Sequence, residues 1–194
     1  YIDLFSFHGL STKKLMDYVL REGGNMTVAE ELKAEGKIKH IGFSTHGTPR
    51  VIRELILSDK FAYANIHYHF FGSYHAAGND DGTGQEGNLG NLKLCLEKDM
   101  GVFIISPFDK GGMLYKPSEE MCQLTGPNLP PLIFAALHLW NVGAHTISVG
   151  IAKPSDFDEV LHAASIMDDE NTQSLVRRAE RNLNKQCVRE RGGG

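Results

Sequence analysis

The segment LKAEGKIKHIGFS, residues 32–44, contains the end of an amphipathic helix, a stop at Gly36 and a short apolar strand. Glycine ends helices because it adopts the left-handed C-cap conformation without a steric cost. The predicted strand runs from Lys39 to Ser44, and Thr48 with Pro49 then begins another helix. A helix, a strand and a helix in succession indicate a parallel sheet with helical crossover connections.

The same alternation continues on both sides of this segment. Short apolar runs predict four more strands, at 2–8, 63–68, 102–107 and 146–150. Helical spacing predicts helices between and after them. These begin near Ser11-Thr12, Asn25 or Thr27, Thr48, Leu89, Pro130, Phe157 and Asn171. In three of them the apolar stripes are Val28, Ala29 and Leu32; Leu89, Leu92 and Leu96; and Phe157, Val160, Leu161 and Ala164. Two long polar loops, 72–88 and one containing Lys110 and Pro117, interrupt the pattern.

This alternation predicts an α/β fold and leaves two arrangements open. One is an open doubly wound sheet, and the other is part of a (β/α)8 barrel. A doubly wound nucleotide fold favours Gly-x-Gly-x-x-Gly after its first strand, and His8-Gly9-Leu10 does not provide it. Five strand-and-helix units are too few for the roughly 250 residues of a closed barrel.

Composition excludes several classes of function. The chain has 194 residues, of which 41% are hydrophobic, and its net charge is -4, which argues against general nucleic-acid binding. Apolar runs such as 102–106 are far shorter than the roughly 20 residues of a membrane span. The three cysteines are widely spaced and favour a reducing compartment, cytoplasmic or organellar. The chain starts with Tyr1 inside a predicted strand, so we expect an upstream segment.

Polar residues follow each predicted strand. They are His8, then Ser44 to His46, Asn65 to His69, Ser106 to Phe108, and Gly150 to Ser155. In parallel α/β folds the carboxyl ends of the strands meet at one edge of the sheet. The sequence therefore predicts one site built from several loops.

Four segments carry a resemblance to a known family. YIDLFSFH (1–8) resembles the "DLxxxH" strand of aldo/keto reductases, and LKAEGKIKHIGFS (32–44) resembles their "GkiR.iGvS" segment. IISPFDKGGML (104–114) is similar to their "PLg.G.L" turn, and TISVG (146–150) with KPS (153–155) is similar to the last strand and nucleotide loop. The resemblance covers about residues 1–165 and is nearest to the branch with iron–sulfur relatives.

The resemblance implies a fold and an activity. The five strands would be the fourth to eighth of a (β/α)8 barrel, with residues 1–165 forming that part and 166–194 a C-terminal helix and a disordered glycine tail. The intact protein would reduce an aldehyde or ketone with NAD(P)H. Only His8 of the family's Asp, Tyr, Lys and His catalytic group lies here, since the other three belong to earlier strands. The alternative is a catalytically inactive structural or docking subunit of a larger assembly.

The resemblance also implies cofactor-binding residues. Ser44, Thr45 and Asn65 would hold the nicotinamide carboxamide, and Ile105 would replace an aromatic residue that stacks on the ring. Backbone amides of 106–108 and 110–112, including Ser106, Phe108 and Lys110, would hold pyrophosphate. The last strand and its loop would contribute Gly150, Lys153, Ser155 and Glu159. Asp156 stands where an arginine clamps the 2′-phosphate, and Val160 stands where these relatives have an asparagine. This implies either a preference for the unphosphorylated cofactor, with NADH binding at least as well as NADPH, or decay of the site.

Other features give weaker expectations. His67 and His69 could share one face of a strand and bind zinc, but no third ligand follows at a recognisable spacing, and we expect no metal. A single Cys187 cannot hold an iron–sulfur cluster. The expected partners are a small carbonyl substrate and an upstream segment or partner protein that covers the Ile2–His8 edge, with no nucleic acid and no membrane span.

Overall fold

A computed structural model describes residues 1–70, 87–108 and 113–191 of the chain. Five strands form a single sheet in the order β1-β2-β3-β4-β5, and every neighbouring pair is parallel. The strands are β1 (Ile2–Phe7), β2 (Ile38–Ser44), β3 (Tyr63–His67), β4 (Gly101–Ile105) and β5 (Thr146–Ser148). A strictly sequential order without reversal is typical of a barrel segment and differs from a doubly wound sheet. The predicted α/β class is therefore confirmed as part of a (β/α)8 barrel.

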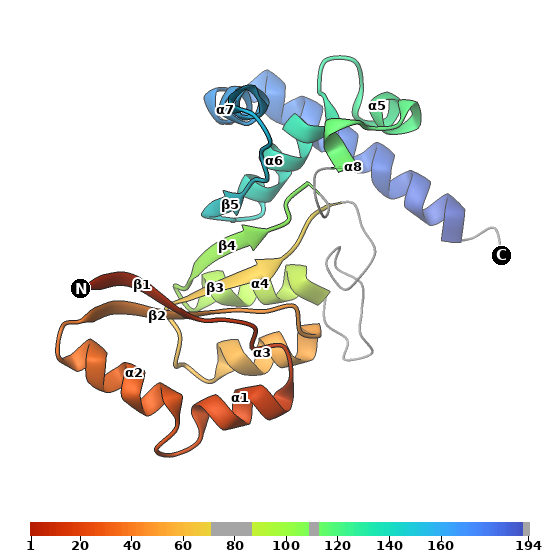
Figure 1. Cartoon of the computed structure of the whole chain (residues 1–194). Helices are drawn as coiled ribbons and strands as arrows, with labels where there is room; N and C mark the ends of the chain where they lie inside the picture. The colour runs from red at the N-terminus through yellow and green to blue at the C-terminus, as the bar shows by residue number, and fades with distance from the viewer. Residues whose placement is uncertain (71–86, 109–112, 192–194) are drawn as a thin grey trace.

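Helices connect each strand to the next, and further helices follow the last strand. They are α1 (Lys13–Leu20), α2 (Asn25–Ala34), α3 (Pro49–Leu57), α4 (Gly87–Glu97), α5 (Glu119–Thr125), α6 (Pro131–Asn141), α7 (Asp158–Ser165) and α8 (Glu170–Arg191). Two short 3-10 turns, η2 (Met113–Tyr115) and η3 (Pro154–Phe157), precede α5 and α7. In Figure 1, α1 to α4 lie beside β1 to β4, whereas α5 to α8 gather beyond β5.

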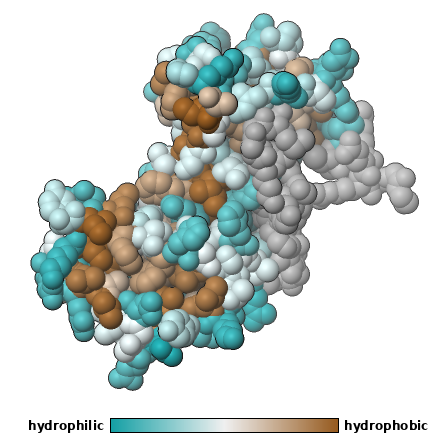
Figure 2. Space-filling view, in the orientation of Figure 1, coloured by the Kyte–Doolittle hydropathy of each residue, from teal (hydrophilic) through white to brown (hydrophobic). Residues whose placement is uncertain are grey.

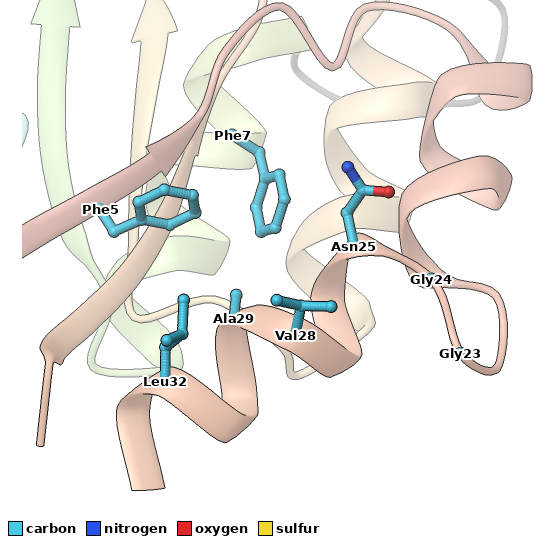
Figure 3. A pocket seen from close by; sticks show the side chains of 8 residues that line it. All are labelled: Phe5, Phe7, Gly23, Gly24, Asn25, Val28, Ala29 and Leu32. Carbon is cyan, nitrogen blue, oxygen red and sulfur yellow. The ribbon is translucent and has the colours of Figure 1, made fainter. Parts of the chain in front are cut away.

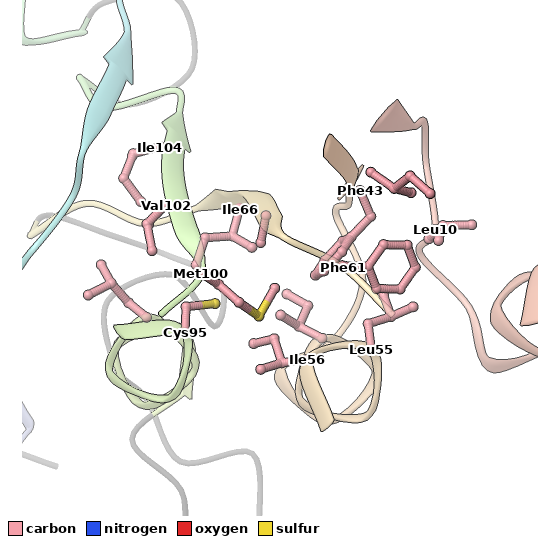
Figure 4. Close-up of a cluster of buried hydrophobic side chains, with 14 of the residues drawn as sticks. Leu10, Phe43, Leu55, Ile56, Phe61, Ile66, Cys95, Met100, Val102 and Ile104 are labelled. Atoms are coloured by element: carbon pink, nitrogen blue, oxygen red, sulfur yellow. The ribbon is translucent and has the colours of Figure 1, made fainter. Parts of the chain in front are cut away.

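Alternation along the strands separates the two faces of the sheet. Ile41, Ala64, Ile66, Val102 and Ile104 are at most 3% exposed and form the first core cluster with the helices. Figure 4 shows Ile66, Val102 and Ile104 on the same side of the sheet as α3 and α4, which contribute Leu55 and Cys95 to this cluster. Burial raises the pKa of the Cys95 thiol to about 12. A second cluster joins α6, α7 and α8 through residues such as Phe134, Ala163, Val176, Ala179 and Leu183.

Capping chemistry explains where several helices begin. The predicted caps Thr12 and Thr48 accept hydrogen bonds from Leu15 N and Val51 N, and Pro49 is the first residue of α3. Asp169 accepts from Thr172 N at 2.7 Å just before α8, which lowers the pKa of its carboxyl group. The N-cap of α2 is Gly24 rather than Asn25 or Thr27, and it makes no side-chain cap.

The predicted apolar stripes of α4 and α7 are wrong in part. On α4, Leu96 is 38% exposed, while Asn88, Asn91 and Cys95 are buried with Leu92. Asn88 and Asn91 are tolerated there because their amides donate to the carbonyls of His67 and Pro49, at 2.8 and 2.9 Å.

Helix α7 also presents a different face. It buries Ala163 and packs Val160 on the second cluster, while Leu161 is 64% exposed. Helix α5, in the region predicted as a loop, begins at the cap Ser118, whose side chain accepts from Met121 N. Most of the predicted loop 72–88, and the glycine tail, lie outside the described residues.

One close approach in the sheet gives a stability prediction. Gly42 of β2 lies opposite Tyr63 of β3, and a Cβ added at Gly42 would meet the Tyr63 ring at 2.4 Å. Tyr63 is buried, so its ring has little room to move. We expect Gly42→Ala to lower the free energy of unfolding by about 1–3 kcal/mol, measured by urea denaturation.

The control is Gly150→Ala, because a Cβ there has nothing within 4 Å. It is expected to change stability by less than about 0.5 kcal/mol. Combining Gly42→Ala with Tyr63→Ala removes the ring, and the penalty of the alanine at position 42 should then largely disappear. Equal losses for Gly42→Ala in both backgrounds would contradict this account.

Candidate active site at the carboxyl ends of the strands

The register of the sheet brings three predicted site residues together. Ser44, the last residue of β2, lies opposite Asn65 of β3. His8 directly follows β1, and its Nδ1 lies 2.9 Å from Ser44 Oγ. His8, Ser44 and Asn65 therefore occupy one end of three neighbouring strands, as the sequence predicted.

Ser44 orients the His8 ring. The backbone N–H of Gly9 donates to Ser44 Oγ at 3.3 Å, so this oxygen already accepts one hydrogen bond. The hydroxyl hydrogen then remains to donate to His8 Nδ1, an arrangement that favours the neutral tautomer with its hydrogen on Nε2. The exposed imidazole is thus held by one nitrogen, and the other is available at the surface.

Thr45 joins two loops at this end of the sheet. Its hydroxyl donates to the carbonyl of Leu10 at 2.7 Å and accepts from Gly47 N at 2.9 Å. The residue is 1% exposed. Ser11 reinforces the junction, because its Oγ accepts from His46 N at 3.0 Å. Since these bonds join the loop after β1 to the loop after β2, Thr45 holds in place two loops that flank the site. Its contact with a carboxamide stays a prediction.

Asn65 presents an acceptor that has no partner in the described part of the chain. Its Oδ1 is buried and has no hydrogen bond among the described residues. The strand register places Ser44 on one side of Asn65 and Phe103 on the other. Two positions farther, His67 lies opposite Ile105, which is partly exposed.

Sequence reasoning missed the residue that holds the end of β3. Asn88 of α4 donates to the carbonyl of His67 at 2.8 Å, and Asn91 donates to Asn88 Oδ1 at 3.3 Å. The sequence did contain a signal for this contact, namely two asparagines three residues apart on one helix face. A buried helix face rarely holds asparagines unless their amides have hydrogen-bond partners.

The carboxyl end of β4 carries backbone strain. Ser106 directly follows the strand and has φ 54°, in the left-handed region that costs a non-glycine residue roughly 1 kcal/mol. Phe108 is buried in the second cluster, with its ring centroid 6.1 Å from that of Tyr115. The predicted pyrophosphate ligand Lys110 lies outside the described residues, as do Gly111 and Gly112.

At the end of β5, Asp156 is bound by its own loop. Its carboxylate accepts from the backbone N–H groups of Ala152 and Lys153, at 2.8 and 3.1 Å. The Ala152 hydrogen bond is the main cause of the lowered pKa of this carboxyl, and the Lys153 amide and charge add to it. Because the folded-state pKa is lowered, these contacts stabilise the loop at neutral pH and are lost as the pH falls through that pKa.

Tyr115 is a second residue that the sequence did not reveal. Its hydroxyl donates to the carbonyl of Gly150 at 2.9 Å, which connects the turn after β4 to the end of β5. Burial raises the pKa of Tyr115, and the negative charges of Asp156 and Glu159 raise it further. The predicted nucleotide loop is therefore locally acidic. Its predicted ligands Lys153, Ser155 and Glu159 are exposed on it.

The histidines near the site form a loose aromatic group. The ring centroids of His67 and His69 are 5.0 Å apart, and those of His46 and His67 are 6.2 Å apart. Within the described ranges, no three or more His, Cys, Asp or Glu side chains are arranged to hold a metal ion. No helix in the same part of the chain combines the length and apolarity needed to span a bilayer.

The contact between Ser44 and His8 can be tested directly. Ser44→Ala removes the hydroxyl that fixes His8 Nδ1, so we expect the His8 tautomers to shift toward the mixture of a free imidazole, seen by nitrogen NMR. The lost partner of Gly9 N should also cost about 1 kcal/mol of stability. Ser58→Ala is the control, because its hydroxyl donates to the Leu55 carbonyl far from His8. Unchanged His8 ring shifts in Ser44→Ala would contradict the assignment.

Comparison with known proteins supports the fold. Searches found no matching family model and no matching curated protein. Solved structures do match, among them an aldose reductase from Giardia lamblia (17% identity, TM-score 0.60, 94% of this chain and 62% of that chain). The holo form of an aldo-keto reductase from Bacillus halodurans has 18% identity and TM-score 0.64, over 94% and 59%. An aldo/keto reductase from Brucella melitensis has 17% identity and TM-score 0.54, over 92% and 60%.

This chain thus spans about three fifths of the length of these solved structures. The sequential parallel sheet and the position of its helices agree with part of their barrel. The particular branch with iron–sulfur relatives stays a prediction. The described chain has the fold of part of an aldo/keto reductase barrel.

Proposed function

We propose that this chain is the cofactor-binding part of an NAD(P)H-dependent oxidoreductase that, in the intact protein, reduces an aldehyde or ketone. The observation that carries this proposal is the convergence of His8, Ser44 and Asn65 at the carboxyl ends of three neighbouring strands. Reactive groups of parallel barrels gather at this end. The names of the matching solved structures, aldose reductase and aldo-keto reductase, support the same reaction class.

Asn65 provides a test of whether a nicotinamide fits. A buried acceptor without a donor costs about 1–3 kcal/mol, and Asn65 Oδ1 is such an acceptor among the described residues. The amide NH2 of a nicotinamide carboxamide is a donor that would satisfy it. The residues therefore fit the group, with Ser44 and Asn65 at the carboxamide and Ile105 against the ring.

The chemistry divides between the cofactor and the chain. When bound, the nicotinamide supplies the hydride. His8 orients the substrate carbonyl through its exposed imidazole, which Ser44 holds in place. Proton transfer to the carbonyl oxygen is assigned by the resemblance to a tyrosine on an earlier barrel strand, so the complete reaction is proposed only for the intact protein.

We also propose that NADH binds at least as tightly as NADPH. A 2′-phosphate needs cationic partners and free amide donors. In the predicted nucleotide loop, the Ala152 and Lys153 amides already donate to Asp156, and Glu159 adds a second negative charge nearby. Lys153 is a single point charge and cannot provide the bidentate contact of an arginine.

Fluorescence titration of the protein with NADH and NADPH tests both proposals. Asn65→Ala is expected to weaken NADH binding about fivefold to tenfold, because one hydrogen bond to the carboxamide is lost. Asp156→Asn is expected to raise the affinity for NADPH relative to NADH, because a negative charge is removed and the loop amides are less firmly held.

Matched controls use the same residue types elsewhere. Asn25→Ala changes an exposed amide in the pocket beside β1 and should leave binding unchanged. Asp158→Asn removes a neighbouring charge at the start of α7 and should change the cofactor ratio less than Asp156→Asn. Absence of any nucleotide binding would overturn the proposed function, and tighter binding of NADPH by the natural chain would overturn the cofactor preference.

The edge of β1 supports a third proposal, that another segment covers it. In the described sheet β1 pairs only with β2, and Tyr1, Ile2 and Leu4 are 82%, 51% and 48% exposed. Figure 2 shows apolar residues gathered on this side of the molecule. An open edge strand with apolar side chains is a site for pairing with another strand.

A pocket next to β1 supports the same proposal. Phe5 and Phe7 from β1 face Val28, Ala29 and Leu32 from α2, and Asn25 lies at the rim (Figure 3). The pocket has a volume of about 340 Å³. Its apolar walls fit the side chains of a helix, so we propose a strand-and-helix segment as the occupant, from upstream in the same polypeptide or from a partner protein.

Expression of residues 1–194 alone tests the open edge. We expect this chain to self-associate or to unfold without cooperativity. Size-exclusion chromatography measures the association, and near-UV circular dichroism measures the unfolding. Leu4→Lys adds a charge to the edge and should reduce the association, whereas Leu161→Lys, on the exposed face of α7, should not. A monomer of the natural sequence that unfolds cooperatively would overturn the proposal.

A further inference from the structure

Away from the predicted cofactor site, α6 buries a histidine between a phenol and a carboxylate. His138 is 5% exposed. Its Nε2 lies 3.3 Å from Tyr68 Oη, and its Nδ1 lies 2.8 Å from Glu180 Oε1. The three side chains belong to the segment after β3, to α6 and to α8, so this polar chain links elements far apart in the sequence.

The donors and acceptors fix the direction of these hydrogen bonds. An ionised carboxylate only accepts, so the Nδ1–H of His138 donates to Glu180. In its neutral form the imidazole then presents Nε2 as an acceptor, and the Tyr68 hydroxyl donates to it. Glu180 therefore determines which tautomer of His138 meets Tyr68, because without the carboxylate the ring can carry its hydrogen on Nε2 instead.

Aromatic neighbours shield this chain of hydrogen bonds. The Phe70 ring meets His138 edge-on at a centroid distance of 4.8 Å, and Phe134 stacks on it at 6.0 Å. Hydrogen bonds in such a poorly polar environment are stronger, and losing one partner is more costly, than at the surface. Glu180 remains partly exposed, so its carboxylate keeps contact with solvent.

The position of Tyr68 connects the network to the predicted site. Tyr68 immediately follows β3 and is three residues from Asn65, about 10 Å along an extended chain. Other polar contacts of α8 join different elements: Gln173 pairs with Asn141 of α6, and Asn182 donates to the Leu124 carbonyl of α5. Among the described polar contacts of α8, the one between Glu180 and His138 leads, through Tyr68, to the carboxyl end of β3.

We propose that Glu180 is a positioning residue for the predicted cofactor site. Through His138 and Tyr68 it fixes the segment that follows β3, and so the orientation of Asn65. The C-terminal helix thereby sets the geometry of a site that it does not line. The effect on cofactor binding rests on the proposed function, whereas the effect on β3 does not.

The experiment compares four single variants of the 194-residue chain and one double mutant. Glu180→Leu removes the carboxylate, and Tyr68→Phe removes only the phenol hydroxyl. Glu180→Gln retains an acceptor for His138 Nδ1 and should rescue the loss. Asn182→Ala is the matched control, because it removes another polar contact of α8 that does not lead to β3.

We expect nitrogen NMR of His138 to show loss of the Nδ1–H tautomer in Glu180→Leu but not in Glu180→Gln or Asn182→Ala. Hydrogen exchange of the amides at 65–68 should accelerate in Glu180→Leu and Tyr68→Phe, and not in Asn182→Ala. The affinity for NADH should fall about fivefold in Glu180→Leu and in Tyr68→Phe. The double mutant should lose no more affinity than either single variant.

Unchanged exchange at 65–68 in Glu180→Leu, or equal acceleration in Asn182→Ala, would overturn the proposal. Fully additive effects of Glu180→Leu and Tyr68→Phe would also overturn it. If the natural protein binds no nucleotide, the proposed function fails, but the tautomer and exchange measurements still decide whether Glu180 positions the end of β3.

Discussion

The parallel direction of all five strands is the constraint on which the rest of this structure depends. Parallel strands cannot be joined by tight turns, so each connection crosses back through a helix. These helices cover one face of the sheet, and every carboxyl end points to the same edge. Ser44 therefore lies opposite Asn65, and His8 reaches Ser44, although the three residues come from distant parts of the sequence.

The order of elements could be predicted because apolar periodicity and caps act locally. The segment 32–44 indicates its helix stop and strand from neighbouring residues alone, and Thr48 with Pro49 begins α3 where expected. The buried faces of α4 and α7 could not be predicted in the same way. They depend on distant partners: Asn88 is buried because it meets the His67 carbonyl, and Leu161 is exposed because α7 turns Ala163 toward the core.

The candidate site shows the same division between what is local and what is not. Family resemblance identified His8, Ser44 and Asn65 by position, and the sheet places them together. The family resemblance could not show with which partners the nearby polar groups form their hydrogen bonds. Thr45 donates inward to Leu10, and Asp156 accepts from the amides of its own loop. A residue type at a family position thus indicates which chemistry is available, while the local hydrogen bonds determine whether it faces a ligand.

The end of β3 illustrates how such a site is held in place. Its backbone carbonyl at His67 accepts a hydrogen bond from Asn88 of α4, and the following residue, Tyr68, is bound to α6 and α8 through His138 and Glu180. Both contacts are buried polar interactions, which are more sensitive to geometry than apolar packing is. An apolar core tolerates small shifts of a helix, but a hydrogen bond weakens steeply when its angle or distance changes. The polar links between helices and strand ends, more than the apolar clusters, therefore fix where Asn65 presents its side-chain oxygen, which has no partner among the described residues.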